Sequence, residues 1–217
     1  LSSAFHNGLK VVTSETVVNI EEERGSVRVK SGSNIYQSEN VVICSPDVLS
    51  EILGIPITTG YAPIAVVENV PEEENSFVEL DYYVKRCINL INKKEGIAQA
   101  GGITLNHQKD IKAYLAYIIS EHKKRNPGIQ VVDSYVGLKR ELLQKGQERN
   151  YLYHINKNSR NIWSVVLGKF SLAFSMAPEF YRKVYHKNPS KLIEPFGYFD
   201  NSAILSDTSW QEIVNID

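Results

Sequence analysis

The sequence predicts an α+β fold built on an antiparallel-rich mixed sheet with few helices. Short segments rich in Val, Ile and aromatic residues recur between turn-forming residues along the chain. One long amphipathic helix is predicted near the middle, over 108–125. The 217 residues, 42% of them hydrophobic, are enough for one large domain or two small ones.

Three strand-like segments come first, at 9–20, 25–32 and 34–46. Residues 26–30 alternate strictly between polar and apolar, which is typical of a strand with one face in water. The run Val-Val-Ile-Cys at 41–44 has four consecutive apolar residues. We therefore expect a strand buried on both faces there, as in a parallel sheet.

The middle of the chain predicts an antiparallel sheet between two helices. A short helix is expected over 47–53, because Gly54 follows it as a stop. Three strand-like segments follow, at 57–70, 76–86 and 95–105. The helix over 108–125 ends at Asn126-Pro127-Gly128, and its basic last turn suits the helix dipole without a nucleic-acid partner.

The last third returns to strands, followed by one helix. The strand-like segments lie at 129–138, 150–155 and 161–168. A helix is predicted over 177–185, with Pro178 in its first turn. From Glu194 onward the chain has five acidic residues and no Lys or Arg, so this tail carries −5 against +4 for the rest. Its aromatic and aliphatic residues lead us to expect that it packs on the protein.

The chain has 24 Lys and Arg residues and 25 Asp and Glu residues. Its near-zero net charge therefore produces no overall positive electrostatic field that would attract nucleic acid or an anionic membrane. No apolar stretch approaches the roughly 18–20 residues of a membrane span, and residues 1–10 lack the pattern of a secretion signal. We therefore expect a soluble cytoplasmic protein. Cys44 and Cys87 lie in apolar segments without metal-like spacing, and we predict buried free thiols.

Common nucleotide-binding and hydrolase motifs are absent: the sequence has no GxGxxG, GxxxxGK[ST], HExxH or GxSxG. The five histidines form no pair at i, i+3 or i, i+4, so no helical metal site is predicted. Glu72-Glu73-Glu74 is interpreted as a solvated turn. Because the chain begins at Leu1 and its only methionine is Met176, we expect a fragment of a longer protein.

Several short motifs occur in a characteristic order. They read VVNI, GSVRVKSG, NVVICSP, ITTGYAPIAVVE, then GGITL with a helix and YVGLKRE, and finally NIWSVVLGKFSLAFSMAPEF. Across roughly residues 9–185 this order resembles that of FAD-dependent oxidoreductases of the D-amino-acid oxidase and glycerol-3-phosphate dehydrogenase class.

The resemblance implies FAD as cofactor and a small anionic amine or hydroxyl compound as substrate. It implies that 1–58 belongs to an FAD-binding domain, 59–160 to an antiparallel substrate-binding domain, and 161–217 to the FAD side and the acidic tail. The implied substrate-binding residues are Lys139, Arg140, Tyr82, Tyr83 and Tyr135. The implied cofactor-binding residues are Val18, Cys44, Ser45, Gly168 and Lys169. It implies no particular catalytic residue and no metal ligand.

The chain departs from the family pattern in three places. Cys44-Ser45-Pro46 stands where the family has Ala-x-Gly, which removes a glycine that lets backbone approach the cofactor. Lys139, followed by Arg140, stands where the family has arginine, and the two cations do not clamp a carboxylate alike. The family's N-terminal nucleotide-binding unit does not occur in this sequence, so we expect a missing N-terminal segment or a partner subunit to supply it.

Three hypotheses therefore stay open. The chain is the substrate-binding part of an FAD-dependent oxidoreductase, or a non-catalytic partner subunit or degenerate homologue without FAD, or an unrelated α+β ligand-binding domain. The departures at Cys44-Ser45-Pro46 and Lys139 favour the second hypothesis. An upstream sequence without a glycine-rich βαβ start would favour the third.

Overall fold

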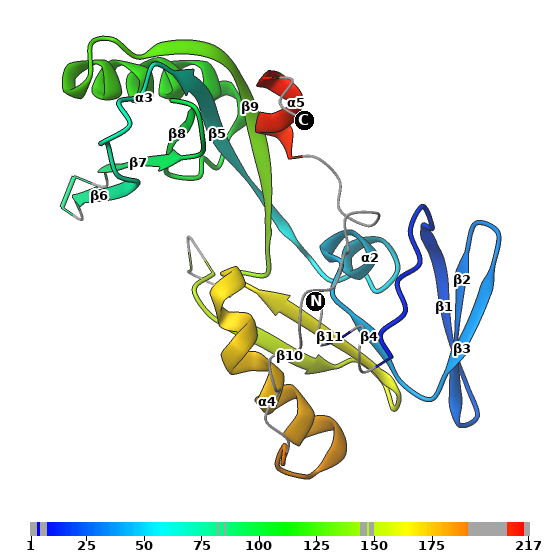
Figure 1. The fold of residues 1–217 in the computed structure, drawn as a ribbon. Coiled ribbons are helices and arrows are strands. Elements are labelled where there is room, and N and C mark those ends of the chain that lie inside the picture. Colours follow the sequence, from blue (N-terminus) through cyan, green and yellow to red (C-terminus); the bar gives the residue numbers. More distant parts are fainter. Residues whose placement is uncertain are drawn as a thin grey trace. The chain divides into compact units, whose positions relative to one another are not determined.

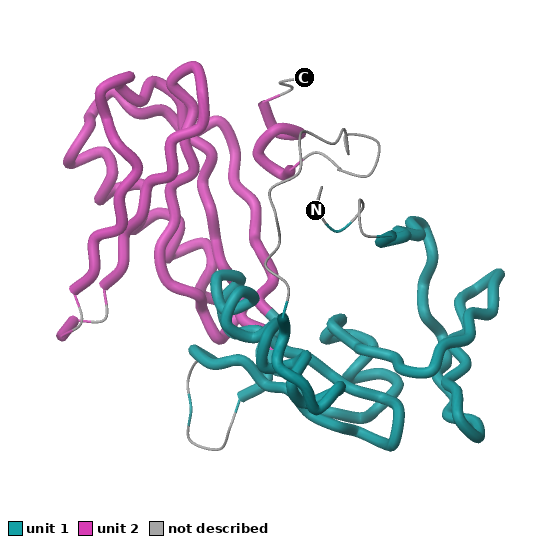
Figure 2. The backbone as a smooth tube through the Cα atoms, turned by 60° about the horizontal axis from the view of Figure 1, so that its bottom comes forward, with its two compact units in different colours: residues 1–58, 140–205 teal, residues 59–139, 206–217 magenta. Residues whose placement is uncertain are grey.

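The computed structural model of the chain describes residues 4, 8–81, 83–84, 86–143, 147, 150–190 and 208–214 (Figure 1). The chain divides into two compact units (Figure 2): unit 1 comprises residues 1–58 and 140–205, and unit 2 comprises residues 59–139 and 206–217. The predicted α+β fold, with antiparallel-rich sheets and few helices, is confirmed. No helix in the described part of the chain is long and apolar enough to cross a membrane.

Unit 1 begins with a three-stranded antiparallel sheet of order β1-β2-β3, formed by β1 (Val17–Glu23), β2 (Ser26–Ser31) and β3 (Ile35–Ser38). The alternation predicted for 26–30 is confirmed, because Val27 is buried whereas Arg28 is exposed. The register of β1 on β2 shifts between Val17 and Asn19, so Val18 occupies a β-bulge.

A second sheet in unit 1 has the order β10-β11-β4, with β10 (Tyr153–Lys157), β11 (Ile162–Leu167) and β4 (Val41–Ile43). β4 pairs in parallel with β11, as the apolar run at 41–44 predicted. The expectation of burial on both faces was wrong, since Val42 is 41% exposed. β4 is the last strand of this sheet as described, so only one of its edges is paired.

The described part of unit 1 also contains the α-helices α2 (Pro46–Glu51) and α4 (Ala173–Tyr185). α4 starts four residues before the predicted 177, because the short 3-10 helix η2 (Phe170–Leu172) leads directly into it. Pro178 consequently lies inside the helix and not in its first turn, where its missing N–H leaves one helical hydrogen bond unmade. The core of unit 1 joins both sheets to α2 through Val27, Ile43, Leu49, Ile162 and Val166.

Unit 2 is built on a five-stranded sheet of order β6-β7-β8-β5-β9. Its strands are β5 (Thr58–Glu68), β6 (Phe77–Asp81), β7 (Arg86–Asn92), β8 (Ala98–Gly102) and β9 (Gln130–Glu141). The β6–β7, β7–β8 and β8–β5 pairs are antiparallel, as predicted. Its helices are η1 (Gln108–Asp110), α3 (Ile111–Arg125) and α5 (Ser209–Val214).

Helix α3 covers one face of this sheet. Ile118 of α3 is fully buried in a core with Ala65, Leu90, Ala98 and Ala100, which all point to the same side of their strands. Val66, Ile91 and Gln99 occupy the alternate positions and pair with one another across β5, β8 and β7, so they mark the second face.

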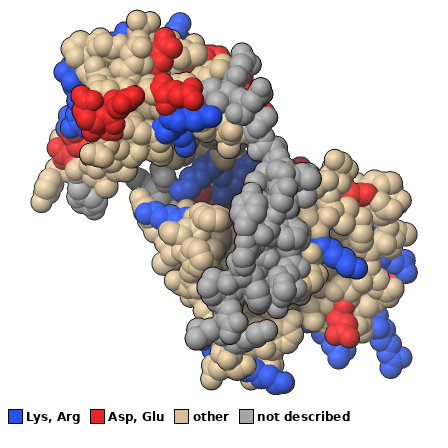
Figure 3. Space-filling model, viewed as in Figure 1, with Lys and Arg blue, Asp and Glu red and all other residues tan. Residues whose placement is uncertain are grey.

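On the surface drawn in Figure 3, acidic and basic side chains are interspersed over both units.

Gly102, which ends β8, permits a close approach between the sheet and α3. A Cβ atom there would overlap the Tyr114 hydroxyl and the Cys87 carbonyl, and would lie 2.8 Å from Ile118 Cδ1. The Tyr114 hydroxyl accepts a hydrogen bond from the Ile103 amide at 2.7 Å, and burial raises the pKa of this phenol. The missing side chain of Gly102 thus lets helix α3 approach the sheet closely.

A buried histidine on α3 contacts the β6–β7 hairpin. His122 is 2% exposed, and its ring lies 5.9 Å from the Phe77 ring of β6. It hydrogen-bonds to the backbone of Asn89 in β7, whereas its Nε2 has no hydrogen-bond partner in the described part of the chain. Burial lowers the pKa of His122, and nearby Arg125 lowers it further.

The stability of unit 2 is expected to fall as the pH drops from about 7.5 to 5.5, because of His122. The lowered pKa means that the folded state binds fewer protons than the unfolded state once the pH approaches the unfolded value of about 6.5. The urea midpoint, measured against pH, should therefore depend less on pH in His122→Gln than in the parent protein. An equal dependence in both proteins would contradict this role of His122.

Candidate functional site

The carboxyl ends of β4 and β11 bring four of the implied cofactor residues to one sheet edge. The two strands run in parallel, with Ile43 opposite Ser164. Cys44-Ser45 follows β4 directly, and Gly168-Lys169 follows β11. In open α/β sheets, ligands bind outside the carboxyl ends of parallel strands. This edge is therefore the candidate cofactor side of the chain.

The two residues after β4 differ in what they contact. The Ser45 hydroxyl caps α2 by accepting a hydrogen bond from the Val48 amide at 3.4 Å, and Pro46 occupies the first turn. Cys44 is exposed, so its predicted burial was wrong, although the surrounding protein still raises the pKa of the thiol. Cys87 is half-buried, and both cysteines are free.

Gly168 lies against the backbone of the chain itself. A Cβ atom at this position would overlap the Asn150 carbonyl oxygen and would lie 2.9 Å from the Leu152 carbonyl oxygen. The Gly168 amide donates to that Leu152 carbonyl at 2.9 Å. The glycine is therefore required for packing of the turn after β11, independently of any ligand.

A buried polar cluster supports this turn, and sequence patterns did not reveal it. Asn150 is 1% exposed, and its backbone N–H donates a hydrogen bond to Oε1 of Glu141, which is 4% exposed. Asn150 Oδ1 accepts a hydrogen bond from the Leu152 amide and lies 3.3 Å from His154 Nε2. These contacts join the end of β9 to the start of β10. Polar residues separated along the chain carry no periodic signal, so only the fold brings them together.

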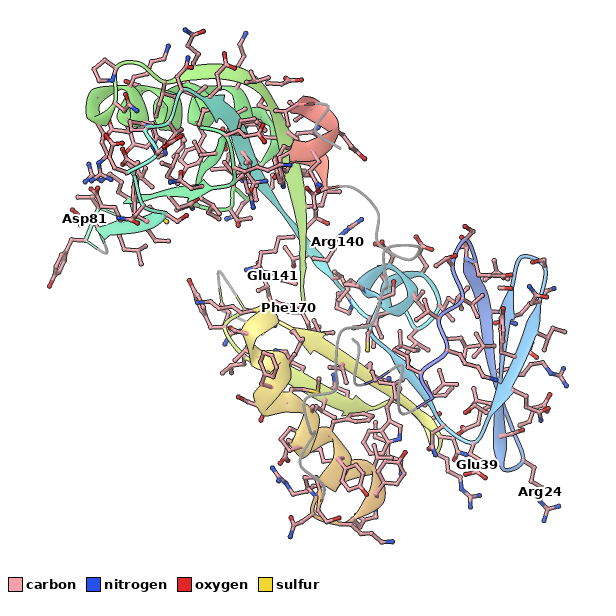
Figure 4. All side chains as sticks on the ribbon, in the orientation of Figure 1. Arg24, Glu39, Asp81, Arg140, Glu141 and Phe170 are labelled. Carbon is pink, nitrogen blue, oxygen red and sulfur yellow. The ribbon has the colours of Figure 1, made fainter. Side chains whose placement is uncertain are left out.

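Lys169 and the aromatic side chains near it form the rest of this edge. Lys169 Nζ lies 5.1 Å from the centre of the Tyr151 ring. Phe170 begins η2 (Figure 4) and Phe174 is the second residue of α4. Both side chains are more than 80% exposed. Val18 lies elsewhere in unit 1, on β1 of the other sheet, and is half exposed. The structure therefore does not place Val18 on the sheet that carries the other four.

The second face of the unit 2 sheet carries the best candidate substrate groups. Gln99 Nε2 of β8 donates a 2.7 Å hydrogen bond to the Tyr135 hydroxyl of β9. Burial raises the pKa of Tyr135, and this hydrogen bond opposes the rise. Lys139 follows Tyr135 by four residues in the same strand, so both lie on one strand face. Arg140 lies on the opposite face of the strand.

Arg140, where the chain re-enters unit 1, is paired with an acidic side chain of that same unit. Its Nη2 lies 3.1 Å from Asp47 Oδ1, and both side chains are exposed. Figure 4 shows Arg140 and Glu141 at the end of β9. Side chains alternate between the two faces of β9. Of the two cations proposed for the substrate, Lys139 is the one that shares a strand face with Tyr135.

The tyrosines of the β6–β7 hairpin lie at the other edge of the sheet. Tyr83 is 95% exposed and follows β6, which is the strand furthest from β9. Four interstrand spacings amount to about 19 Å, so a small substrate cannot touch both Tyr83 and Tyr135. Tyr82 lies outside the described residues. Among the described residues, no group of three His, Cys, Asp or Glu side chains forms a candidate metal site.

The residues after β4 and β11 fit part of FAD. Phe170 and Phe174 offer exposed apolar side chains for a ring after β11, and Lys169 offers a cation in the same stretch of chain. The sequence contains no glycine-rich GxGxxG segment for the pyrophosphate. The fit therefore concerns the ring end of the cofactor.

No protein-family model and no curated protein match the chain. Solved structures do match. L-proline dehydrogenase from P. horikoshii superposes with a TM-score of 0.64 at 12% identity, over 86% of this chain and 54% of that protein. L-amino acid deaminase from Proteus vulgaris, in a form lacking its specific insertion, gives 0.61 at 14% identity, over 87% of this chain and 50% of that protein.

A third match is an FAD-dependent oxidoreductase from Pseudomonas aeruginosa, with a TM-score of 0.54 at 13% identity, over 86% of this chain and 58% of that protein. The chain thus spans about half the length of the solved proteins that it matches. The likeness establishes the fold, which is that of FAD-dependent amino acid oxidases and dehydrogenases.

Proposed function

We propose that the chain is part of a cytoplasmic FAD-dependent oxidoreductase that acts on a small anionic amine or hydroxyl compound. The observation that carries this proposal is the shared fold, which extends over 86% of the chain in the first match named above. Within that fold, four of the residues implied by the family resemblance follow two neighbouring parallel strands. Unit 1 contributes to the cofactor side, and unit 2 binds the substrate.

Each unit contributes distinct groups in this proposal. In unit 1, the turns at Cys44-Ser45 and Gly168-Lys169 hold the ring end of FAD, which accepts a hydride from the substrate when bound. In unit 2, Lys139 attracts the substrate carboxylate and the Tyr135 hydroxyl donates a hydrogen bond. These protein groups bind and orient the substrate without taking part in electron transfer.

In this proposal the pyrophosphate of FAD is bound by a polypeptide segment that is not part of this sequence. A glycine-rich nucleotide-binding unit places phosphate at a helix N-terminus, and this sequence contains no such motif. The unit comes from an N-terminal segment of the same protein or from a partner subunit. Both sources give the same site chemistry.

Lys139→Gln is expected to raise KM for a carboxylate substrate about tenfold to hundredfold, because a charge-assisted hydrogen bond contributes about 1.5–3 kcal/mol. The measurement is anaerobic reduction of the bound flavin by small 2-amino and 2-hydroxy acids, with the holoprotein. The matched control is Arg140→Gln, which removes a cation on the opposite strand face that is paired with Asp47. An equal rise in KM for both variants would contradict the assignment of Lys139.

A non-catalytic partner subunit is the second candidate function. The geometry after β4 favours it, because Ser45 and Pro46 start a helix at the place where the family has a glycine. A folded protein that is isolated without bound flavin would support this candidate.

A further inference from the structure

The hydrogen bond between Gln99 and Tyr135 crosses a strand on the second face of the unit 2 sheet. β5 lies between β8 and β9, so the two side chains reach toward each other over two interstrand spacings, about 10 Å. Gln99 Nε2 and the Tyr135 hydroxyl oxygen are 2.7 Å apart, and both residues are half-buried. This contact fixes the position of the phenol oxygen.

The direction of this hydrogen bond determines where the phenol proton points. An amide NH2 group only donates, so the Tyr135 oxygen is the acceptor in this contact. A hydroxyl group that accepts one hydrogen bond still has a proton to donate. That proton must point away from Gln99 Nε2.

A cation lies on the same strand face as this hydroxyl. Tyr135, Gly137 and Lys139 alternate along β9, so their outward directions coincide. Four residues along the strand separate the Cα atoms of Tyr135 and Lys139 by about 13 Å. The Lys139 ammonium therefore attracts an anion to this face, and the Tyr135 O–H is the group that donates to an acceptor oxygen of a small carboxylate.

We propose that Gln99 is a positioning residue that turns the Tyr135 hydroxyl proton toward an acceptor oxygen of a carboxylate ligand. This inference rests on the proposed function, in which unit 2 binds the substrate. Gln99 acts through Tyr135 and does not itself contact the ligand.

The test follows the Tyr135 phenol directly. The holoprotein is labelled with 13C at tyrosine Cζ, and Tyr135→Phe assigns the signal. Gln99→Leu removes the donor, and Gln99→Glu replaces it with an acceptor. Gln37→Leu is the matched control, because Gln37 Nε2 makes a similar 2.9 Å hydrogen bond to the Ser26 hydroxyl in unit 1.

We expect the pKa of Tyr135 to rise in Gln99→Leu and in Gln99→Glu, since each loses the donor that stabilises the phenolate. Glycine and glycolate serve as minimal carboxylate probes. Their addition is expected to shift the Tyr135 signal in the parent protein and in Gln37→Leu, but not in Gln99→Glu, where the carboxylate takes the phenol proton. With a turned-over substrate, Gln99→Leu is expected to raise KM about five- to tenfold.

An unchanged Tyr135 pKa in Gln99→Leu, or an equal response to the probes in Gln99→Glu and the parent, would overturn the inference. The Tyr135 signal does not depend on flavin reduction. If the signal behaves as expected while no acid reduces the flavin, the positioning role of Gln99 stands and the oxidoreductase proposal fails.

Discussion

Gly102→Ala is expected to destabilise unit 2 by about 3 kcal/mol. The added methyl group would overlap the Tyr114 hydroxyl and the Cys87 carbonyl, and would press on Ile118 of α3. The Cys87 carbonyl belongs to a strand of the sheet and cannot move without disturbing the hydrogen bonds of that strand. Helix α3 must therefore shift away from the core. The measurement is the urea-induced unfolding of the parent and the variant at neutral pH.

The matched control for this prediction is Gly137→Ala in β9 of the same sheet. A Cβ atom at Gly137 would make only ordinary contacts, at 3.7 Å from the Ala62 carbonyl oxygen and 3.8 Å from Ala62 Cβ. The free energy of unfolding of Gly137→Ala is therefore expected to differ from that of the parent protein by less than about 0.5 kcal/mol. Equal stability of Gly102→Ala and the control would show that α3 does not pack on Gly102 as described.

Gly168→Ala is expected to have a similarly large effect on unit 1, also about 3 kcal/mol. The methyl group would meet the backbone of Asn150 and Leu152, and Asn150 is itself fixed by the buried Glu141. The turn that carries Lys169 must therefore move or unfold locally. The loss is expected in the absence of any flavin, because the obstacle is the chain's own backbone.

The control is Gly32→Ala, also in unit 1. No atom lies within 4 Å of a Cβ atom built at Gly32, so the change in stability is expected to stay within about 0.5 kcal/mol. Thermal unfolding of both variants without added FAD makes the comparison. A destabilisation of Gly168→Ala that disappears in flavin-free protein would mean that Gly168 serves the ligand and not the fold.

The fold class and most strands could be predicted because their signals are local. Alternation at 26–30 identified β2, and the apolar run at 41–44 identified the parallel strand β4. The exposure of Val42 could not be predicted, because hydrophobic composition does not tell an edge strand from a central one. The first residue of α4 could not be predicted either, because the helix continues directly from η2, which has no strong sequence pattern of its own.

The candidate site was harder to predict, because it depends on strand order. Tyr83 and Tyr135 have similar sequence surroundings, and only the order β6-β7-β8-β5-β9 separates them to opposite edges. The same order brings Gln99 beside Tyr135 across an intervening strand. Asn150 is a core residue for the same reason, since its partners come from β9, β10 and the turn after β11.

The absorption spectrum of the protein, isolated from its source without added cofactor, tests the proposed flavoprotein function most directly. The account predicts flavin absorption bands at about 370 and 450 nm, displaced from those of free FAD by the protein environment. A pure, folded protein whose spectrum shows only the absorption of its tyrosines and tryptophans would contradict the account, and this fold would then serve a function without flavin.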